Sequence, residues 1–335
     1  MQRRHLKRLN RPVLAVSFTS IAALIGCSGG SGGERQAAAI STPQAVLALS
    51  EEVTREADLI APRNVGEAIP GLTLEEAEQF TTGLARFTTV KKPDEGLGPV
   101  FNARSCSECH VQGAIGGAAF DQTISVVTRF GAVVNEAYVD LPEKGGPVLQ
   151  RRSLAEIDPA CPIGPEVVPS EATSVSHRTT TPLFGTGLIE GIPEATLRRL
   201  ADPDDSDHDG ISGRLNTIVN PETGQVEIGR FGWKAQISSL SVFSADAYLN
   251  EMGITTPLFP QELLPQGLTI DGMDTVLEPE DDGTDTLAFT HYMRWLAPPV
   301  PAATLSSESG RRGRRVFEQV GCVSCHVPEL ASGQH

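Results

Sequence analysis

The chain has 335 residues, with 27 Lys and Arg against 42 Asp and Glu, so its net charge at pH 7 is −15. A chain this acidic repels phosphate backbones, which excludes nucleic acid as a partner. Only 5% of the residues are aromatic, whereas 33 Gly and 24 Pro indicate many turns and irregular segments.

The first 26 residues have the layout of an export signal. A basic run, MQRRHLKRLNR, precedes the apolar stretch PVLAVSFTSIAALIG, which is short for a membrane span. The residues LIGC, ending at Cys27, resemble the lipobox of bacterial lipoproteins, in which the cysteine is lipidated, and the flexible sequence SGGSGGERQ follows. We therefore expect a signal peptide over 1–26 and a lipidated Cys27 with a tether over 27–45. The alternative is an ordinary cleaved signal with a chance cysteine.

A helix is predicted over the sequence LTLEEAEQFTTGLARF, residues 72–87. Thr73 can cap its N-terminus, and Glu76, three residues later, can complete a capping box with it. Phe80, Leu84 and Phe87 recur at helical spacing, which indicates one buried face.

The first cysteine motif follows in NARSCSECHVQG, residues 102–113, where Cys106 and Cys109 precede His110. This C-x-x-C-H pattern is typical of c-type haem attachment. The two thiols form thioethers with the haem vinyl groups, and the adjacent imidazole binds the iron. Val100 and Phe101, just ahead of the motif, are expected to cover the macrocycle.

Three other sites use paired cysteines, namely disulfides, zinc sites and thioredoxin-like redox pairs. Four thiolates would satisfy zinc without a histidine after each pair, and the flanks lack the βαβ context of a redox pair. The sequence therefore favours haem. Cys161, in DPACPIG, has no partner motif, and we expect a buried inert thiol there, with a reactive thiol as the alternative.

An acidic segment, DPDDSDHDGISGRLN, spans residues 202–216. Asp205, Asp207 and Asp209 alternate before a glycine and the carbonyl of Ile211, as in the first half of an EF-hand calcium loop. Asn216 stands where the loop would need a bidentate carboxylate, which would weaken binding. The segment predicts a calcium site, and a solvated acidic turn is the alternative.

The second C-x-x-C-H motif lies in QVGCVSCHVPEL, where Cys322 and Cys325 precede His326. Gly313 and Phe317 lie on a short segment leading into it, which looks like the opening helix of a class I cytochrome c domain. Only nine residues follow the motif, too few to enclose a haem. We therefore expect a fragment whose second haem domain is cut short, with completion by a second chain as the alternative.

Five segments taken in order resemble one family. They are GPVFNARSCSECH, TTPLFGTGLIEGIPE, ADPDDSDHDGISGRLN, RFGWKAQISSLSVFSADAYLNEMGITTPLF and GCVSCHVP. Together they are similar to the di-haem c oxidoreductases often labelled thiol oxidoreductases, relatives of bacterial di-haem cytochrome c peroxidases and MauG-type enzymes. The resemblance runs from about residue 65 to the end. It implies two cytochrome c-like domains facing each other, with peroxide chemistry at the first haem.

The resemblance also implies roles for individual residues. Arg178, in HRTTTPLFG, matches an arginine of the peroxidases and could pair with a haem propionate. Trp233 would be the relay between the haems, and Glu251, 18 positions later, the distal acid and base that moves a proton between peroxide oxygens. The alternative for Arg178 is a solvated surface arginine. For Trp233 it is an aromatic residue of the core, and for Glu251 a surface carboxylate. The partner glutamine of the peroxidases has no clear counterpart, since Gln236 lies too close to Trp233.

The distal ligand of the first haem has three candidates. His177 resembles the distal histidine of resting peroxidases, although its separation from His110 is larger than in those enzymes. Met252 offers a thioether, and His291 is the third choice.

The predicted fold class is mainly α with many irregular loops. The first cytochrome c-like domain, with long insertions, would span 46–300, and the incomplete second would span 301–335. The function expected is that of a lipid-anchored, periplasm-facing enzyme, placed in the outer membrane, that takes electrons from a small redox protein and reduces a peroxide-like oxidant. The alternatives are a di-haem electron-transfer cytochrome and, with less support, a surface protein of iron acquisition that uses haem as a redox helper.

Overall fold

The computed structural model describes residues 15–17, 65–119, 126–270, 273, 276–299 and 303–333. Apart from residues 15–17, the predicted signal peptide, Cys27 and the tether lie outside the described residues. Within the described ranges, no helix combines the length and the hydropathy that crossing a bilayer requires. The described chain divides into two compact units: the larger lies within Asn64–Pro298, and the smaller contains residues 303–333 together with Ala15–Ser17.

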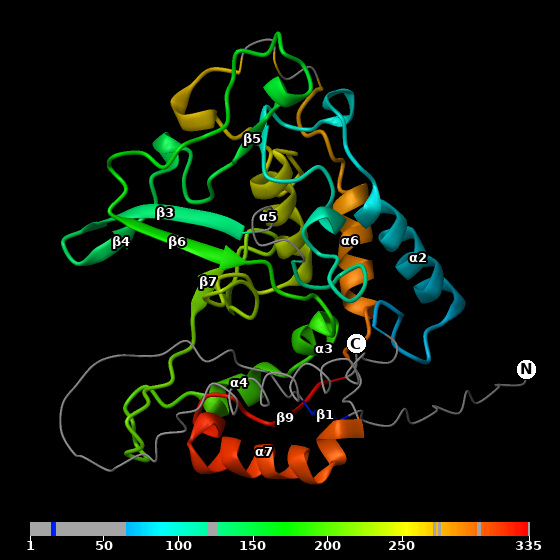
Figure 1. The fold of residues 1–335 in the computed structure, drawn as a ribbon, viewed down its shortest axis with the longest axis vertical. Helices are drawn as coiled ribbons and strands as arrows, with labels where there is room; N and C mark the ends of the chain where they lie inside the picture. Colours follow the sequence, from blue (N-terminus) through cyan, green and yellow to red (C-terminus); the bar gives the residue numbers. More distant parts are fainter. Residues whose placement is uncertain are drawn as a thin grey trace, which may run out of the picture. The chain divides into compact units, whose positions relative to one another are not determined.

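The larger unit contains helices and small sheets (Figure 1). Its described helices are α2 (Leu74–Thr88), α3 (Thr186–Glu190), α4 (Glu194–Leu200), α5 (Leu240–Met252) and α6 (Thr284–Trp295). Its strands are β2 (Val100–Phe101), β3 (Val126–Val134), β4 (Ala137–Val139), β5 (Arg152–Ser153), β6 (Ser174–Thr179), β7 (Thr217–Val219) and β8 (Val226–Ile228). Short 3₁₀ turns connect several of these, including Cys106–Glu108.

Helix α2 begins where the sequence predicts it. The Thr73 hydroxyl accepts a hydrogen bond from the Glu76 amide at 3.2 Å, and the Glu76 carboxylate accepts one from the Thr73 amide at 2.7 Å. Two amide groups that the first turn leaves without a helical partner are thereby satisfied. Phe80 and Phe87 are buried on the inner face, so the predicted helix and its apolar side are confirmed.

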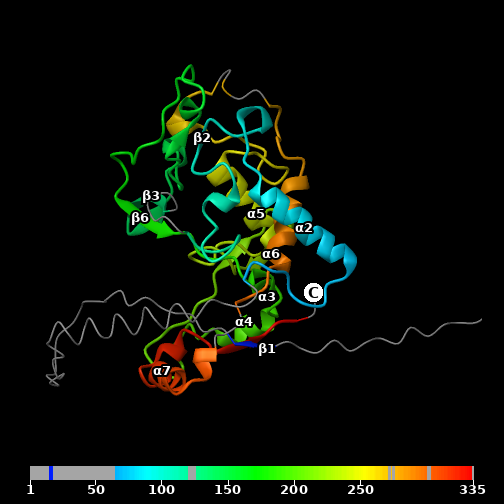
Figure 2. The same cartoon turned by 45° about the vertical axis from the view of Figure 1, so that its right-hand side comes forward.

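Helices α2 and α6 pack directly against each other at Gly83, and both views show them side by side (Figures 1 and 2). A Cβ placed on Gly83 would lie 2.3 Å from the carbonyl oxygen of Ala288 and 2.7 Å from Cβ of Tyr292. Only glycine lets the two backbones come this close. Around the crossing, the ring of Tyr292 packs at a tilt against Phe80 and Phe87, with ring-centroid distances of 5.1 and 4.9 Å.

The largest sheet has the strand order β4-β3-β6, with both pairs antiparallel. In the β3–β6 pair, Val127 lies opposite Arg178 and Thr128 opposite His177. Adjacent residues of a strand point to opposite faces, so Arg178 and His177 point away from each other. Because of this alternation, only one of the two side chains can face the cavity in this unit.

The smaller unit holds the second cysteine motif. Helix α7 (Glu308–Gln319) leads into the 3₁₀ turn Cys322–Ser324, and β9 (Glu329–Ala331) pairs antiparallel with β1 (Ala15–Ser17). None of the described side chains of α7 is buried.

The predicted fold class is confirmed only in part. Helices and long irregular segments dominate, but small sheets also form, and the prediction omitted them. The run VVTRFGAVV of β3 is rich in β-branched residues, which favour strands, so the sequence did contain the signal.

Candidate functional site

The two C-x-x-C-H motifs adopt the same local conformation. In the first, the amides of Cys109 and His110 donate to the Cys106 carbonyl at 3.3 and 3.0 Å. In the second, the amides of Cys325 and His326 donate to the Cys322 carbonyl at 3.2 and 2.8 Å. Each motif is thus a tight turn that presents two sulfur atoms and an imidazole from one short segment.

A phenylalanine contacts the histidine of each motif in the same way. The rings of Phe87 and His110 are 6.1 Å apart with planes inclined by 57°, and those of Phe317 and His326 are 6.0 Å apart and inclined by 58°. Both phenylalanines lie four residues after a helical glycine, in GLARF and GRRVF. The repeat therefore includes the preceding helix as well as the motif.

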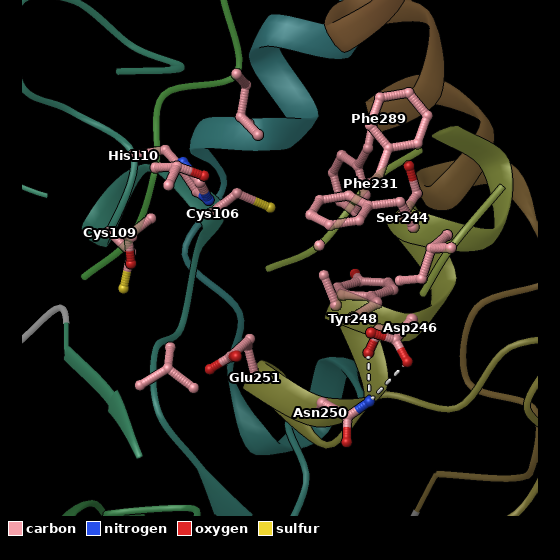
Figure 3. Close-up of a pocket in the computed structure, with 18 of the residues that line it drawn as sticks. Cys106, Cys109, His110, Phe231, Ser244, Asp246, Tyr248, Asn250, Glu251 and Phe289 are labelled. Carbon is pink, nitrogen blue, oxygen red and sulfur yellow. Dashed lines mark hydrogen bonds between the residues drawn. The ribbon is translucent and has the colours of Figure 1, made fainter. Parts of the chain in front are cut away.

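The first motif lines a cavity of about 410 Å³ in the larger unit. Figure 3 shows Cys106, Cys109 and His110 on one side of this cavity, Ser244, Asp246 and Tyr248 of α5 on the other, and Glu251 between the two sides. Strands β3 and β6, helix α6 and the segments 180–183 and 231–237 also contribute to the wall, and most of the lining surface is apolar. A concave site with a largely apolar wall and a few polar groups is typical of a cofactor pocket.

His110 is held in the form that can bind a metal. Its Nδ1 lies 3.1 Å from the carbonyl oxygen of Gly117, and because a carbonyl only accepts, Nδ1 carries the ring proton. Nε2 is then the ring nitrogen that has a lone pair to offer a metal, and the backbone of Thr181 also contacts the ring. Burial lowers the pKa of His110 to about 4, so the ring stays neutral around pH 7.

The Cys106 thiol of the first motif lies on the cavity wall. Burial raises the pKa of Cys106 to about 12, so its sulfur is protonated around pH 7. No disulfide joins Cys106, Cys109, Cys161, Cys322 or Cys325, the cysteines within the described ranges. Cys161 is buried, with 7% of its surface exposed.

Glu251 lines the same cavity from the last turn of α5. Asn102 donates from Nδ2 to its carboxylate at 2.9 Å, and the amides of Asn102 and Ala103 hold its backbone carbonyl at 2.8 and 3.1 Å. Burial is the main cause that raises the pKa of Glu251 to about 7, and the negative charge of Asp246 adds to it. The carboxyl group can therefore exchange a proton near neutral pH.

Asp246 is a second carboxyl group on the cavity wall, and the sequence analysis missed it. Asn250 donates to its side chain at 3.1 Å, as the dashed lines of Figure 3 show. Burial raises the pKa of Asp246 to about 6. Helical spacing counted back from Glu251 gives Tyr248, Ala247 and Ser244, which also line the cavity, but it does not give Asp246, five residues before Glu251.

Trp233 and Arg178 also line the cavity. The Trp233 side chain is 54% exposed, so it lies where the cavity meets solvent. Arg178 points inward from β6, and burial together with the nearby charge of Arg129 lowers its pKa. Gln236 lies on this wall too, and its side-chain oxygen accepts from the Lys234 amide at 2.9 Å.

The three candidates for the distal ligand lie in different places. Met252 is 3% exposed and lines the cavity. His177 is exposed on the opposite face of β6, where Nδ1 lies 3.1 Å from the Thr128 hydroxyl, and it is not on the cavity wall. His291, on α6, is also absent from that wall.

The acidic segment forms a compact exposed loop. Carboxylate oxygens of Asp202, Asp205 and Asp207 lie within 4.8 Å of one another. Asp209 instead accepts from the Ile211 amide at 2.8 Å. Asn216 donates to the carbonyls of residues 234 and 235. The structure thus brings together two of the three predicted aspartates, and adds Asp202, which the sequence analysis did not include.

Residues 169–334 match the model of a family described as "Di-haem oxidoreductase, putative peroxidase". The matched segment contains Arg178, Trp233, Glu251 and the second cysteine motif, and the first motif precedes it. No curated protein and no solved structure matches the chain.

Proposed function

We propose that this protein is a c-type di-haem enzyme that reduces hydrogen peroxide or a related oxidant, because residues 169–334 match the model of the di-haem oxidoreductase family. One observation supports the proposal most strongly. The first cysteine motif and Glu251, a carboxyl group with a pKa near neutrality, face the same apolar cavity.

The residues of the cavity fit a haem in three ways. His110 is neutral and offers Nε2, the donor that haem iron takes from a proximal histidine. Cys106 and Cys109 both reach the wall, where thioether bonds to vinyl groups could form. Arg178 and Arg129 add positive charge, which suits the haem propionates.

When bound, the haem would supply an iron that exchanges single electrons and binds a peroxide oxygen. Glu251 would take a proton from one peroxide oxygen and return it to the other, which heterolytic cleavage of the O–O bond requires. Asn102 would hold the Glu251 carboxylate in place, because its amide donates to one oxygen and leaves the other available.

We further propose a route for the electrons, a location for the protein in the cell and a calcium site. Electrons from a small redox protein would enter at a haem on Cys322 and Cys325, ligated by His326. They would pass through Trp233 to the haem on Cys106 and Cys109. Lipid on Cys27 would anchor the protein in the bacterial cell envelope, facing the periplasm. A weak calcium site would lie at the aspartates of the acidic loop, whose oxygen atoms are the ligands that calcium prefers.

A di-haem electron-transfer cytochrome is the second candidate, and Met252 is the observation that favours it. Its thioether is buried on the cavity wall and could occupy the distal position permanently. The spin state separates the two candidates. Two permanently low-spin irons that ignore peroxide indicate electron transfer alone, whereas a high-spin iron that turns over peroxide indicates the enzyme.

The test of the proposed enzyme is the variant Glu251→Gln, assayed for hydrogen peroxide reduction in the haem-loaded protein. We expect turnover to fall by about 100- to 10,000-fold, the usual cost of losing a general acid and base. Haem content should not change. Glu194→Gln serves as the control, because Glu194 lies on α4, away from the cavity, in an exposed ion pair with Arg198. Full activity in Glu251→Gln would refute the assignment.

A further inference from the structure

Tyr248 is an oxidisable side chain on the wall of the haem cavity. It lies on α5, is 2% exposed and shares the cavity with Cys106 and His110 (Figure 3). Its ring packs edge-on against Phe289 at 5.1 Å, which fixes its orientation. The phenol of Tyr248 would therefore lie beside a haem bound in this cavity.

The phenol has a proton acceptor in place. Its hydroxyl donates to Oδ2 of Asp285 at 3.0 Å, and this carboxylate is itself buried. Lys91 pairs with the same oxygen at 2.7 Å, and Arg86 pairs with Oδ1 at 3.3 Å. Burial and the charge of Asp285 raise the pKa of Tyr248, so the phenol stays protonated at rest.

Oxidation of Tyr248 reverses the preference for the protonated phenol. A phenol that has lost an electron is a strong acid, so its oxidation is easiest where a base can take the proton at once. The carboxylate of Asp285 is already within hydrogen-bonding distance, and no atom has to move far.

Tyr292 provides an internal comparison. It is also fully buried and belongs to the same aromatic cluster, but its hydroxyl donates to the carbonyl oxygen of Ile115 at 2.7 Å. An amide carbonyl cannot take up a proton near neutral pH. Tyr292 therefore lacks the acceptor that Tyr248 has.

We propose that Tyr248 is a one-electron donor to the haem cavity and that Asp285 takes its phenolic proton. The inference rests on the proposed function, because the oxidant is the haem after reaction with hydrogen peroxide. In the step, the phenolic O–H bond breaks, the electron reduces the haem site by one equivalent, and the proton moves to Oδ2 of Asp285. A neutral tyrosyl radical remains. An electron from the donor protein and the proton from Asp285 then restore the phenol.

The experiment is freeze-quench electron paramagnetic resonance of the haem-loaded full chain after mixing with hydrogen peroxide. Ring-deuterated tyrosine distinguishes a tyrosyl radical from one on Trp233. We expect a radical signal that narrows with deuteration, disappears in Tyr248→Phe and persists in Tyr292→Phe. Tyr248→Phe keeps the ring and so preserves the packing. Haem content and circular dichroism check that each variant folds.

Absorption of the haem, recorded in the same mixing experiment, distinguishes a failure of the role of Tyr248 from a failure of the proposed function. If the Soret band shifts with peroxide but no tyrosyl radical forms, or if the radical survives in Tyr248→Phe, the role of Tyr248 is wrong and the proposed function stands. If the Soret band does not respond to peroxide, both the proposed function and the role of Tyr248 fail. Asp285→Asn should lower the radical yield, and an unchanged yield would contradict the role of Asp285 as the proton acceptor.

Discussion

Burial shifts two ionisable groups of the cavity toward their neutral forms, with different consequences. For His110, whose pKa falls to about 4, the neutral form is the one that binds a metal. For Glu251, whose pKa rises to about 7, the two forms coexist around neutrality, so the group can both accept and return a proton. Burial thus prepares one residue as a ligand and the other as an acid and base.

The pH dependence of peroxide reduction should follow the ionisation of Glu251. Its carboxylate must be ionised to accept the first proton. Because the pKa is raised to about 7, the protonated form dominates at lower pH. We expect kcat/KM for hydrogen peroxide to fall by about tenfold per pH unit below that value. Steady-state kinetics between pH 5 and pH 9, a range of about two units on each side, measure it.

Asp246→Asn adds a directional check. Removing the negative charge of Asp246 lowers the pKa of Glu251, so the midpoint of the profile should move to lower pH. The Glu251→Gln variant should show no such midpoint. A midpoint that persists in Glu251→Gln would assign the ionisation to another group.

Residue types and spacing were sufficient to single out the two cysteine motifs, because c-type haem attachment would require two thiols and a histidine in one short run. They were not sufficient for Asp246 and Tyr248. Neither residue belongs to a motif, and what makes each of interest is burial beside a cavity that several elements build. Asn250 follows Asp246 by four residues in the same helix, whereas Asp285 could be paired with Tyr248 only once α5 and α6 were placed.

At the scale of elements, the contact between α2 and α6 holds the first motif in position. Helix α2 carries Phe87, which contacts His110, and α6 carries Phe289 and Met293 on the cavity wall. The crossing at Gly83 brings these two helices together. The sequence predicted α2 from its cap and its apolar spacing, but not its partner helix, because periodicity within one segment does not show what packs against it.

Gly83→Ala tests the crossing. The new Cβ would lie 2.3 Å from a backbone oxygen, so the helices must separate. Alanine favours a helix over glycine by about 1 kcal/mol, but overpacking costs about 1–3 kcal/mol, so we expect a net loss of stability. Urea unfolding measures it.

Gly313→Ala, in α7, is the matched control for that substitution. Gly313 precedes Phe317 as Gly83 precedes Phe87, yet a Cβ at Gly313 meets nothing within 4 Å. Alanine there should leave stability unchanged or raise it by about 1 kcal/mol. Equal effects of the two substitutions would contradict a tight crossing at Gly83.

At the scale of the whole molecule, the chain presents one conformation twice. Each compact unit contains a helix, a phenylalanine at its end and a C-x-x-C-H turn in which the ring of that phenylalanine contacts the histidine. In the larger unit the turn opens onto an apolar cavity with Glu251 on its wall. The repeat supports two attachment sites, and the cavity supports chemistry at the first.

The most direct test of this account is the intact mass of the chain after expression in a host that attaches c-type haem. We predict that the mass exceeds that of the polypeptide by two haem groups. It should exceed it by one after Cys106→Ala with Cys109→Ala, and by one after Cys322→Ala with Cys325→Ala. If Cys106→Ala with Cys109→Ala left the haem mass of the chain unchanged, haem attachment at the first motif would be contradicted.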